Sequence, residues 1–280
     1  MRKKGFTLIE LSVVLVIIGL IIGGVMVGQD LIESANSRAS AKQLEGYNSA
    51  IYAFKIKYGQ MPGDMDGTTA AAIGFVARAG TDGRGDNNGR IVSYCYCGIS
   101  GILGNYTYPW GQSGEALFFW EDLSLAEMIG GVFNTATDGS LGGGVSSNFG
   151  RYFPISRIGN NNYVSVFSGG IYSGGVFSDR AGNYFSVSVP VSIGGSGNYT
   201  STAGMTVLQA YNLDAKIDDG IPNKGRIQAF YNRGGGSPIL YAPNAAVDDS
   251  TTCFNTTRNV YSTAIDGGKN INCGLSFRMQ

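Results

Sequence analysis

The carboxylates and cysteines of this chain are its main candidates for chemistry, and the sequence contains no histidine. Without histidine the chain cannot build a Ser-His-Asp or Cys-His nucleophile system. Asp218 and Asp219 could act only as a carboxylate pair, and sequence neighbours on a turn usually point apart. We therefore expect a protein that is not an enzyme, and look for other roles for its carboxylates.

Glu10 is the most unusual carboxylate, because the run around it is apolar enough to cross a membrane. From Leu11 to Gly28 the only side chain with a polar group is Ser12, and about 18 residues with few charges predict a transmembrane helix. An ionised carboxylate inside the bilayer costs about 2.5 to 3.5 kcal/mol, so such groups usually have a partner. A signal peptide is disfavoured, since the apolar run is too long and no small-x-small cleavage site follows it. A solvated position for Glu10 at the headgroup level is the other alternative.

The start of the chain resembles the processing site of type IV pilins and type II secretion pseudopilins. The segment is Arg2-Lys3-Lys4-Gly5 followed by Phe6-Thr7-Leu8-Ile9-Glu10. The resemblance implies that a prepilin peptidase cleaves between Gly5 and Phe6, and that Phe6 becomes an N-methylated terminus. It also implies that Glu10 pairs with the terminal amine of a neighbouring subunit. A buried ion pair is strongly penalised when one partner is missing, so Glu10 is expected to act in assembly.

The same resemblance implies a structural subunit of a type IV pilus-like or type II secretion pseudopilus filament. Expected partners are copies of the chain or other pilin-like subunits, the prepilin peptidase and the inner-membrane assembly platform. The alternative is a minor or tip subunit whose large head is a binding module, either an adhesin or a substrate-contacting domain. Because basic residues stay in the cytoplasm, we expect one pass through the bacterial inner membrane, with the head outside the cytoplasm, and then a periplasmic or cell-surface filament.

A long N-terminal helix is expected to carry these groups. Apolar residues recur at spacings of mostly three or four, which predicts a stripe facing a core: Leu31, Ala35, Ala39, Leu44, Tyr47, Ile51, Phe54 and Tyr58. A helix from Phe6 to Tyr58 would be about 80 Å long, and Gly59 with the turn residues after it would end it. The expected parts are a leader (1–5), a membrane or filament-core half (6–28), an amphipathic half (29–59) and a head (60–280).

One feature of this helix departs from the family pattern. Many pilins carry a proline in the second half of the apolar segment, whereas this chain has Gly19, Gly23, Gly24 and Gly28 there. Each glycine inside a helix costs about 0.5 to 1 kcal/mol relative to alanine. We therefore expect this stretch to be the softest part of the helix.

The head is expected to be α+β, a Gly-rich antiparallel sheet packed on the long helix as in pilins. Alternating residues predict strands at 163–167 and 184–191, and closing strands at 226–231 and 239–241. Helices are predicted at 113–129, with Ser113 as the cap and Gly130 as the stop, and at 205–217. The net charge is zero and no basic cluster follows the leader, so nucleic acid is not expected as a partner.

A first acidic loop has the spacing of a calcium site. Asp82, Asp86 and Asn88 present oxygen-bearing side chains at alternate positions, as in the first half of a calcium loop. However, Arg84 occupies a ligand position and no bidentate glutamate follows. An ordinary turn of Asp, Asn and Gly is the alternative.

A second acidic group follows the predicted helix at 205–217. Asp214 and Asp218 are four residues apart on one helix face, and Asp219 lies at the turn. Pairing of Asp214 with a basic residue fits the pattern as well as a metal does. Calcium is known in pseudopilin heads, so calcium at either group is the only cofactor we consider, and no other is expected.

The four cysteines favour disulfides in an exported head. The resemblance implies a bridge between Cys253 and Cys273, because pilins close a C-terminal disulfide region, and such a loop gains about 3 kcal/mol in the chain-entropy model. Cys95 and Cys97 are one residue apart, which makes a bridge between them difficult. Pairing of either with Cys253 or Cys273 remains open, and zinc is disfavoured because histidine is absent.

Overall fold

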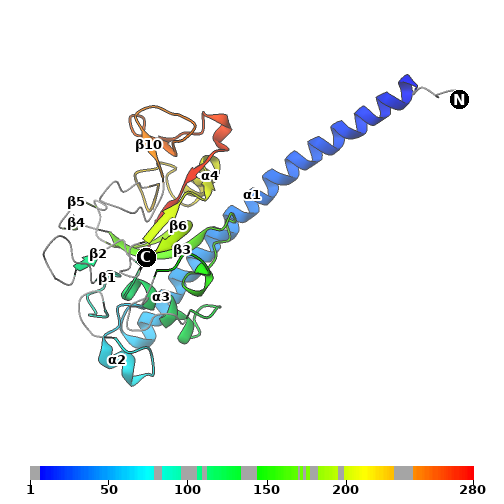
Figure 1. Ribbon diagram of the computed structural model, residues 1–280. Coiled ribbons are helices and arrows are strands. Elements are labelled where there is room, and N and C mark those ends of the chain that lie inside the picture. Colours follow the sequence, from blue (N-terminus) through cyan, green and yellow to red (C-terminus); the bar gives the residue numbers. More distant parts are fainter. Residues whose placement is uncertain are drawn as a thin grey trace.

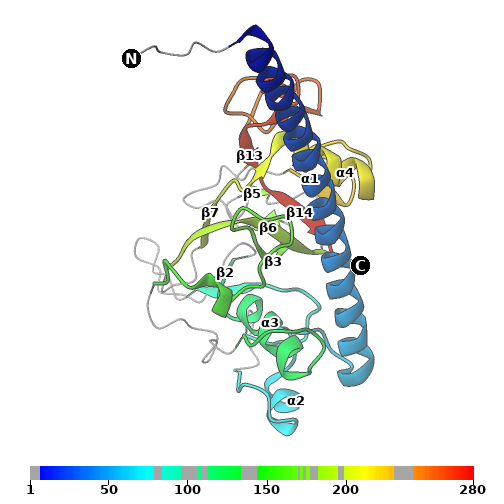
Figure 2. The same ribbon diagram turned by 90° about the vertical axis from the view of Figure 1, so that its right-hand side faces the viewer.

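The computed structural model shows a long helix attached along its second half to a head of short helices and antiparallel strands (Figures 1 and 2). It describes residues 7–78, 84–95, 106–108, 112–133, 144–169, 171–172, 175–176, 182–194, 199–229 and 242–280. The first half of the helix projects away from the head (Figure 1). The predicted α+β class is confirmed.

Helix α1 spans Leu8–Tyr58. It starts at Thr7, an extended N-cap residue, and it runs without interruption through all four glycines of its apolar half. Gly59 ends it in the left-handed conformation, with φ 74°, and donates its N–H to the Lys55 carbonyl. The helix therefore ends at the glycine where the sequence predicted its end, because glycine adopts the left-handed conformation without strain.

Among the described side chains of α1, the buried ones begin at Ser37. Buried residues of this face are Ser37, Ser40, Leu44, Ala50, Ile51 and Phe54. The predicted stripe is therefore wrong in its first part, since Leu31, Ala35 and Ala39 are exposed. Its second part is confirmed, and two serines take buried positions that an apolar pattern could not indicate.

Ser40 and Gln43 attach α1 to the segment before the main sheet. Ser40 Oγ lies 3.3 Å from Ser156 Oγ. The Gln43 amide donates to the Ile155 carbonyl at 2.8 Å and accepts the Arg157 N–H at 2.9 Å. The Gln43 side chain thus pairs with a backbone C=O and a backbone N–H of this segment, as a neighbouring strand would.

The main sheet is antiparallel, with strand order β3-β6-β14-β9, and β7 pairs with the end of β6. Its strands are β3 (Tyr163–Gly169), β6 (Gly182–Ile193), β7 (Tyr199–Thr202), β9 (Ile227–Gln228) and β14 (Leu275–Arg278). The strands predicted at 163–167 and 184–191 are present and longer than expected. Of the closing strands, Ile227–Gln228 is found, and residues 230–241 lie outside the described residues.

The other elements are short. They are α2 (Gly67–Ala72), β1 (Ser93–Cys95), β2 (Tyr106–Tyr108), η1 (Phe149–Arg151), β4 (Ile171–Tyr172), β5 (Gly175–Val176), β8 (Met205–Thr206), β10 (Asn244–Ala245), β11 (Phe254–Asn255), β12 (Val260–Tyr261), η2 (Asp266–Gly268) and β13 (Ile271–Cys273). Strands β10, β11 and β12 form a small separate sheet, in which the β10–β11 pair is parallel.

Helices α3 (Glu115–Leu125) and α4 (Val207–Ile217) are both shorter than predicted. Gly114, not Ser113, is at the N-cap of α3 and makes no side-chain cap bond. The helix ends before Glu127, which adopts a left-handed conformation with φ 57°. Helix α4 begins after Thr206, whose hydroxyl accepts the Gln209 N–H in a capping box.

Aromatic packing joins α1, α3 and the main sheet. Trp120 of α3 lies 4.9 Å from Tyr47 of α1 and 6.1 Å from Phe185 of β6, measured between ring centroids. Trp120 and Phe185 are fully buried. The second half of α1 is therefore part of the hydrophobic core of the head.

A buried ion pair holds the segment after α2 against α3. Arg78 Nη2 lies 2.7 Å from Asp122 Oδ1, Arg78 Nη1 lies 3.0 Å from Asp122 Oδ2, and neither side chain is accessible to solvent. Asp122 also accepts the Gly63 N–H at 2.7 Å. The guanidinium carbon lies 4.4 Å from the centre of the Phe118 ring. This bidentate geometry satisfies both charges.

We expect Arg78→Met to lower the free energy of unfolding by about 3 to 5 kcal/mol, because it leaves the Asp122 carboxylate buried without its partner. The measurement is urea unfolding of the full chain in detergent. Arg258→Met is the matched control, since the Arg258 side chain of the Arg258–Asp248 pair is 58% exposed, and such pairs contribute about 0 to 1 kcal/mol. Equal losses in the two variants would contradict a stabilising role for the buried pair.

Candidate functional site

The first turn of α1 holds the Glu10 carboxylate in place. Glu10 Oε2 accepts the Thr7 N–H at 2.8 Å and the Thr7 hydroxyl at 2.9 Å, and the Glu10 N–H donates to Thr7 Oγ1 at 3.3 Å. This is a capping box, in which the third helical residue and the N-cap satisfy each other's free N–H groups. Sequence reasoning gave Thr7 no role, although Thr7-Leu8-Ile9-Glu10 has the S/T-x-x-E spacing of such a box.

Glu10 keeps the capacity for a further partner. The two bonds from Thr7 are both to Oε2, and an ionised carboxylate has about four acceptor positions on its two oxygens. The side chain is exposed, as is every described residue between Leu8 and Val27. The capping box therefore fixes the direction of the carboxylate and leaves Oε1 available.

The first half of α1 has an apolar surface with no cover from the head. Its large apolar side chains from Leu8 to Val27 are each at least 46% exposed. Within the described residues, α1 is the one helix long and apolar enough to span a membrane. An apolar surface of this extent requires lipid or other helices around it.

The predicted processing residues, Gly5 and Phe6, lie outside the described residues. The N-cap of α1 is Thr7, so a single residue, Phe6, separates the predicted cleavage point from the N-cap. Cleavage there would leave the capping box complete.

The structure joins Cys253 to Cys273, the pairing that the family resemblance implied. Both residues are fully buried. The bridge connects the segment entering β11 with β13, so it holds the small β10–β11–β12 sheet against the rest of the head. It leaves neither residue for Cys95 or Cys97. Cys95 is described only as backbone in β1, and Cys97 lies outside the described residues.

The first acidic cluster contains Asp64, Asp86 and Glu115, whose carboxylate oxygens lie within 4.8 Å of one another. Asp64 and Glu115 are fully buried, and Asp86 is half-buried. Of the set predicted from sequence, only Asp86 belongs to this cluster. Asn88 donates to Asp86 at 2.8 Å, and Asp82 lies outside the described residues. Sequence spacing could not indicate Asp64 and Glu115, because they come from distant segments.

Backbone groups of the 85–92 loop bind these carboxylates. Asp64 Oδ2 accepts the Gly89 N–H at 2.6 Å, and Glu115 accepts two loop N–H groups, both at 2.9 Å. Burial raises the pKa of Asp64 to about 7 and the pKa of Glu115 to about 9, despite these hydrogen bonds. Without a cation, the cluster therefore holds protons near neutral pH.

A calcium ion fits this donor set. Calcium binds oxygen ligands at about 2.3 to 2.6 Å, so oxygens within 4.8 Å of one another can share one ion. Asp64, Asp86 and Glu115 would supply the carboxylate ligands. The charge of the ion would offset the desolvation that raises their pKa.

The second acidic cluster brings Asp214, Asp218 and Asp219 together as predicted, again with oxygens within 4.8 Å. Its carboxylates serve the local fold. Asp214 accepts the Tyr261 hydroxyl at 2.8 Å, and Asp218 accepts the N–H groups of Arg226 and Ile227. Burial raises the pKa of Asp214 to about 7. These bonds join α4 to β9 and β12, so this cluster has a structural role.

Comparison with known families identifies the N-terminal segment. Residues 1–26 match the family described as the prokaryotic N-terminal methylation motif. The matched segment contains Gly5, Phe6, Thr7 and Glu10. No curated protein matches the chain.

Proposed function

Because the chain carries the N-terminal methylation motif, the signature of type IV pilins and pseudopilins, we propose that it is a filament subunit. A prepilin peptidase cleaves it between Gly5 and Phe6, the new terminus is methylated, and the subunit polymerises through α1. The observation that carries this proposal is the position of the motif, directly before an exposed apolar helix. The chain acts as a structural component, without catalysis.

The two halves of α1 support this role. The half from Leu8 to Val27 is exposed on all sides, whereas Leu44, Ile51 and Phe54 of the other half lie in the head core. Lipid covers the first half in the membrane-anchored subunit, and neighbouring helices replace the lipid in the filament. The head lies outside the cytoplasm because the basic leader stays inside.

Glu10 supplies the register of assembly in this proposal. In the membrane its charge is costly, and in the filament the methylated amine of Phe6 on a neighbouring subunit compensates it. The capping box with Thr7 holds Oε2 and presents the remaining oxygen to that amine. Preformed geometry lowers the entropy cost of making the pair.

A second candidate is a minor or tip subunit whose head binds a receptor or a substrate. The size of the head, which extends from the end of α1 to residue 280, favours it. Abundance in sheared filaments separates the two candidates. If the chain is the dominant protein of sheared filaments, it is a main subunit, and if it is present only in trace amounts, it is a minor one. Complete absence of the chain from every filament fraction would contradict both candidates.

We expect calcium to raise the melting temperature of the head, with a larger increase at about pH 8 than at about pH 5. The pKa values of Asp64 and Glu115, about 7 and about 9, exceed those of the unfolded chain. Without metal, the folded state therefore binds more protons, and stability falls as pH rises from about 4 to about 9. Calcium replaces these protons, and at a hundredfold excess over Kd it adds about 2.7 kcal/mol.

The measurement is thermal unfolding of the full chain in detergent, with calcium or with a chelator. Glu115→Gln should abolish most of the calcium effect, and Asp214→Asn, the matched control in the second cluster, should retain it. Melting temperatures that do not respond to calcium at either pH would show that the first cluster is held by protons alone.

A further inference from the structure

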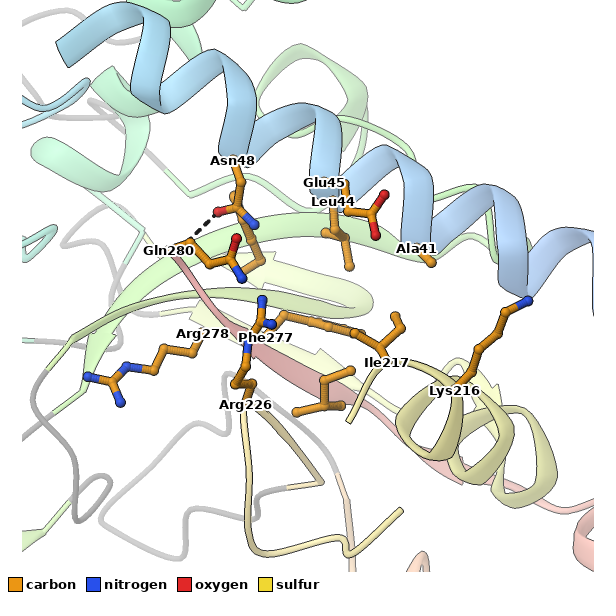
Figure 3. Close-up of a pocket in the computed structure, with 12 residues that line it drawn as sticks. Ala41, Leu44, Glu45, Asn48, Lys216, Ile217, Arg226, Phe277, Arg278 and Gln280 are labelled. Carbon is orange, nitrogen blue, oxygen red and sulfur yellow. Dashed lines mark hydrogen bonds between the residues drawn. The ribbon is translucent and has the colours of Figure 1, made fainter. Parts of the chain in front are cut away.

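A cleft of about 450 Å³ runs between α1 and the edge of the main sheet. Its apolar lining comes from Ala41 and Leu44 of α1, Ile217 at the end of α4, Ile227 of β9 and Phe277 of β14. Figure 3 shows Ala41 and Leu44 on α1 and, beneath this helix, Ile217 and Phe277. The cleft therefore offers an apolar surface at the junction of the long helix with the head.

Basic side chains lie at the two ends of this cleft. Lys216 reaches toward α1 beside Ala41, and Arg226 points toward Gln280 near Asn48 (Figure 3). Both residues are exposed. Neither has a carboxylate within 4 Å in the part of the chain that the structure describes. Glu45 is the acidic side chain of the lining, so positive charge exceeds negative charge, and an occupant with an acidic group and apolar side chains is favoured.

The chain itself contains a segment of this chemistry. Leu31 and Ile32 of α1 are 66% and 63% exposed, although they follow the apolar half and precede the part that the head covers. Asp30 directly precedes them. An acidic loop of the head, 247–249, also carries an exposed valine, but Asp248 is paired with Arg258, and Asp249 binds Thr251. Residues 30–32 of α1 are therefore a better match for the cleft than residues 247–249.

We propose that the cleft of one copy binds residues 30–32 of a second copy in the filament. This inference rests on the proposed filament function. Parallel copies must be shifted along α1 to bring Leu31 level with Ala41 or Leu44. At 1.5 Å per residue the shift is about 15 to 20 Å. Leu31 and Ile32 then cover the apolar walls, and the same register brings position 30 of the helix to the Lys216 end of the cleft, away from Arg226.

Exchange of charges tests this contact. Lys216→Glu and Asp30→Lys should each lower filament recovery by about tenfold or more, because like charges then oppose each other. The variant with both changes should recover most of the yield. Lys224→Glu, a change at another exposed lysine of the head, is the matched control and should assemble as the unchanged chain does. Single variants that assemble normally, or a double variant no better than the single ones, would overturn the proposal.

A covalent test does not depend on yield. In filaments of a Leu31→Cys, Ala41→Cys variant, mild oxidation should link neighbouring copies into dimers and longer ladders. Variants with either cysteine alone should give none of these products. Intact filaments without the links would contradict this contact alone. If the unchanged chain enters no filaments, both the proposed function and the proposed contact fail.

Discussion

Glu10→Gln is expected to reduce filament recovery at least about a hundredfold, with processing and membrane level near those of the unchanged chain. The substitution keeps the size of the side chain and removes its charge. The amine of Phe6 on the neighbouring subunit then lacks its partner, which costs about 3 to 5 kcal/mol for a buried pair. This cost recurs at every subunit addition. The measurement is the ratio of sheared filament to membrane-pool protein.

The capping box makes this experiment specific for charge. Glutamine can still accept the Thr7 N–H, so the first turn of α1 stays capped. Thr7→Val is the matched control, because it removes the hydroxyl that binds Glu10 and keeps the carboxylate. We expect Thr7→Val to retain most of the filament yield, Glu10→Asp to retain part of it, and Glu10→Ala to behave as Glu10→Gln does. Normal assembly with glutamine at this position would show that Glu10 is only a solvated residue at the membrane boundary.

Gly5→Leu is expected to abolish cleavage and therefore assembly. Gly5 directly precedes the predicted cleavage point. A large side chain at this position obstructs the close approach of the backbone to the peptidase that glycine permits. Without cleavage the basic leader stays on the chain, and no free amine forms at Phe6 to pair with Glu10. The measurement is the size of the membrane-bound chain together with filament yield.

A conservative change in the leader provides the control. Lys4→Arg keeps the charge next to Gly5 and should be processed normally. An uncut Gly5→Leu chain that builds normal filaments would remove the basis for the pilin assignment, because assembly would then need neither cleavage nor the new amine.

The long helix could be predicted from sequence because its signals are local. The apolar run, the spacing of Leu44, Ile51 and Phe54, and Gly59 as its end all act over a few residues. The position at which the head begins to cover α1 depends on contacts between residues that are far apart in the sequence. Ala35 and Ala39 fit the periodic pattern but are exposed, whereas Ser40 is buried because Ser156 lies opposite it.

The same distinction applies to the candidate sites. Glu10 and the basic start of the chain were recognisable from adjacent residues, and the matched motif covers the same segment. The acidic cluster was recognisable only at Asp86, since folding brings Asp64 from the segment between α1 and α2 and Glu115 from the first turn of α3. The buried Arg78–Asp122 pair joins residues separated by 44 positions, and no spacing rule identifies such a contact.

Cleavage, methylation and assembly of the chain are tested most directly by its intact mass after isolation from membranes and from sheared filaments. We expect a species that begins at Phe6, carries one methyl group on its terminal amine and retains the Cys253–Cys273 bridge. A chain that keeps residues 1–5 in assembled filaments, or an unmodified amine at Phe6 in all of them, would contradict it.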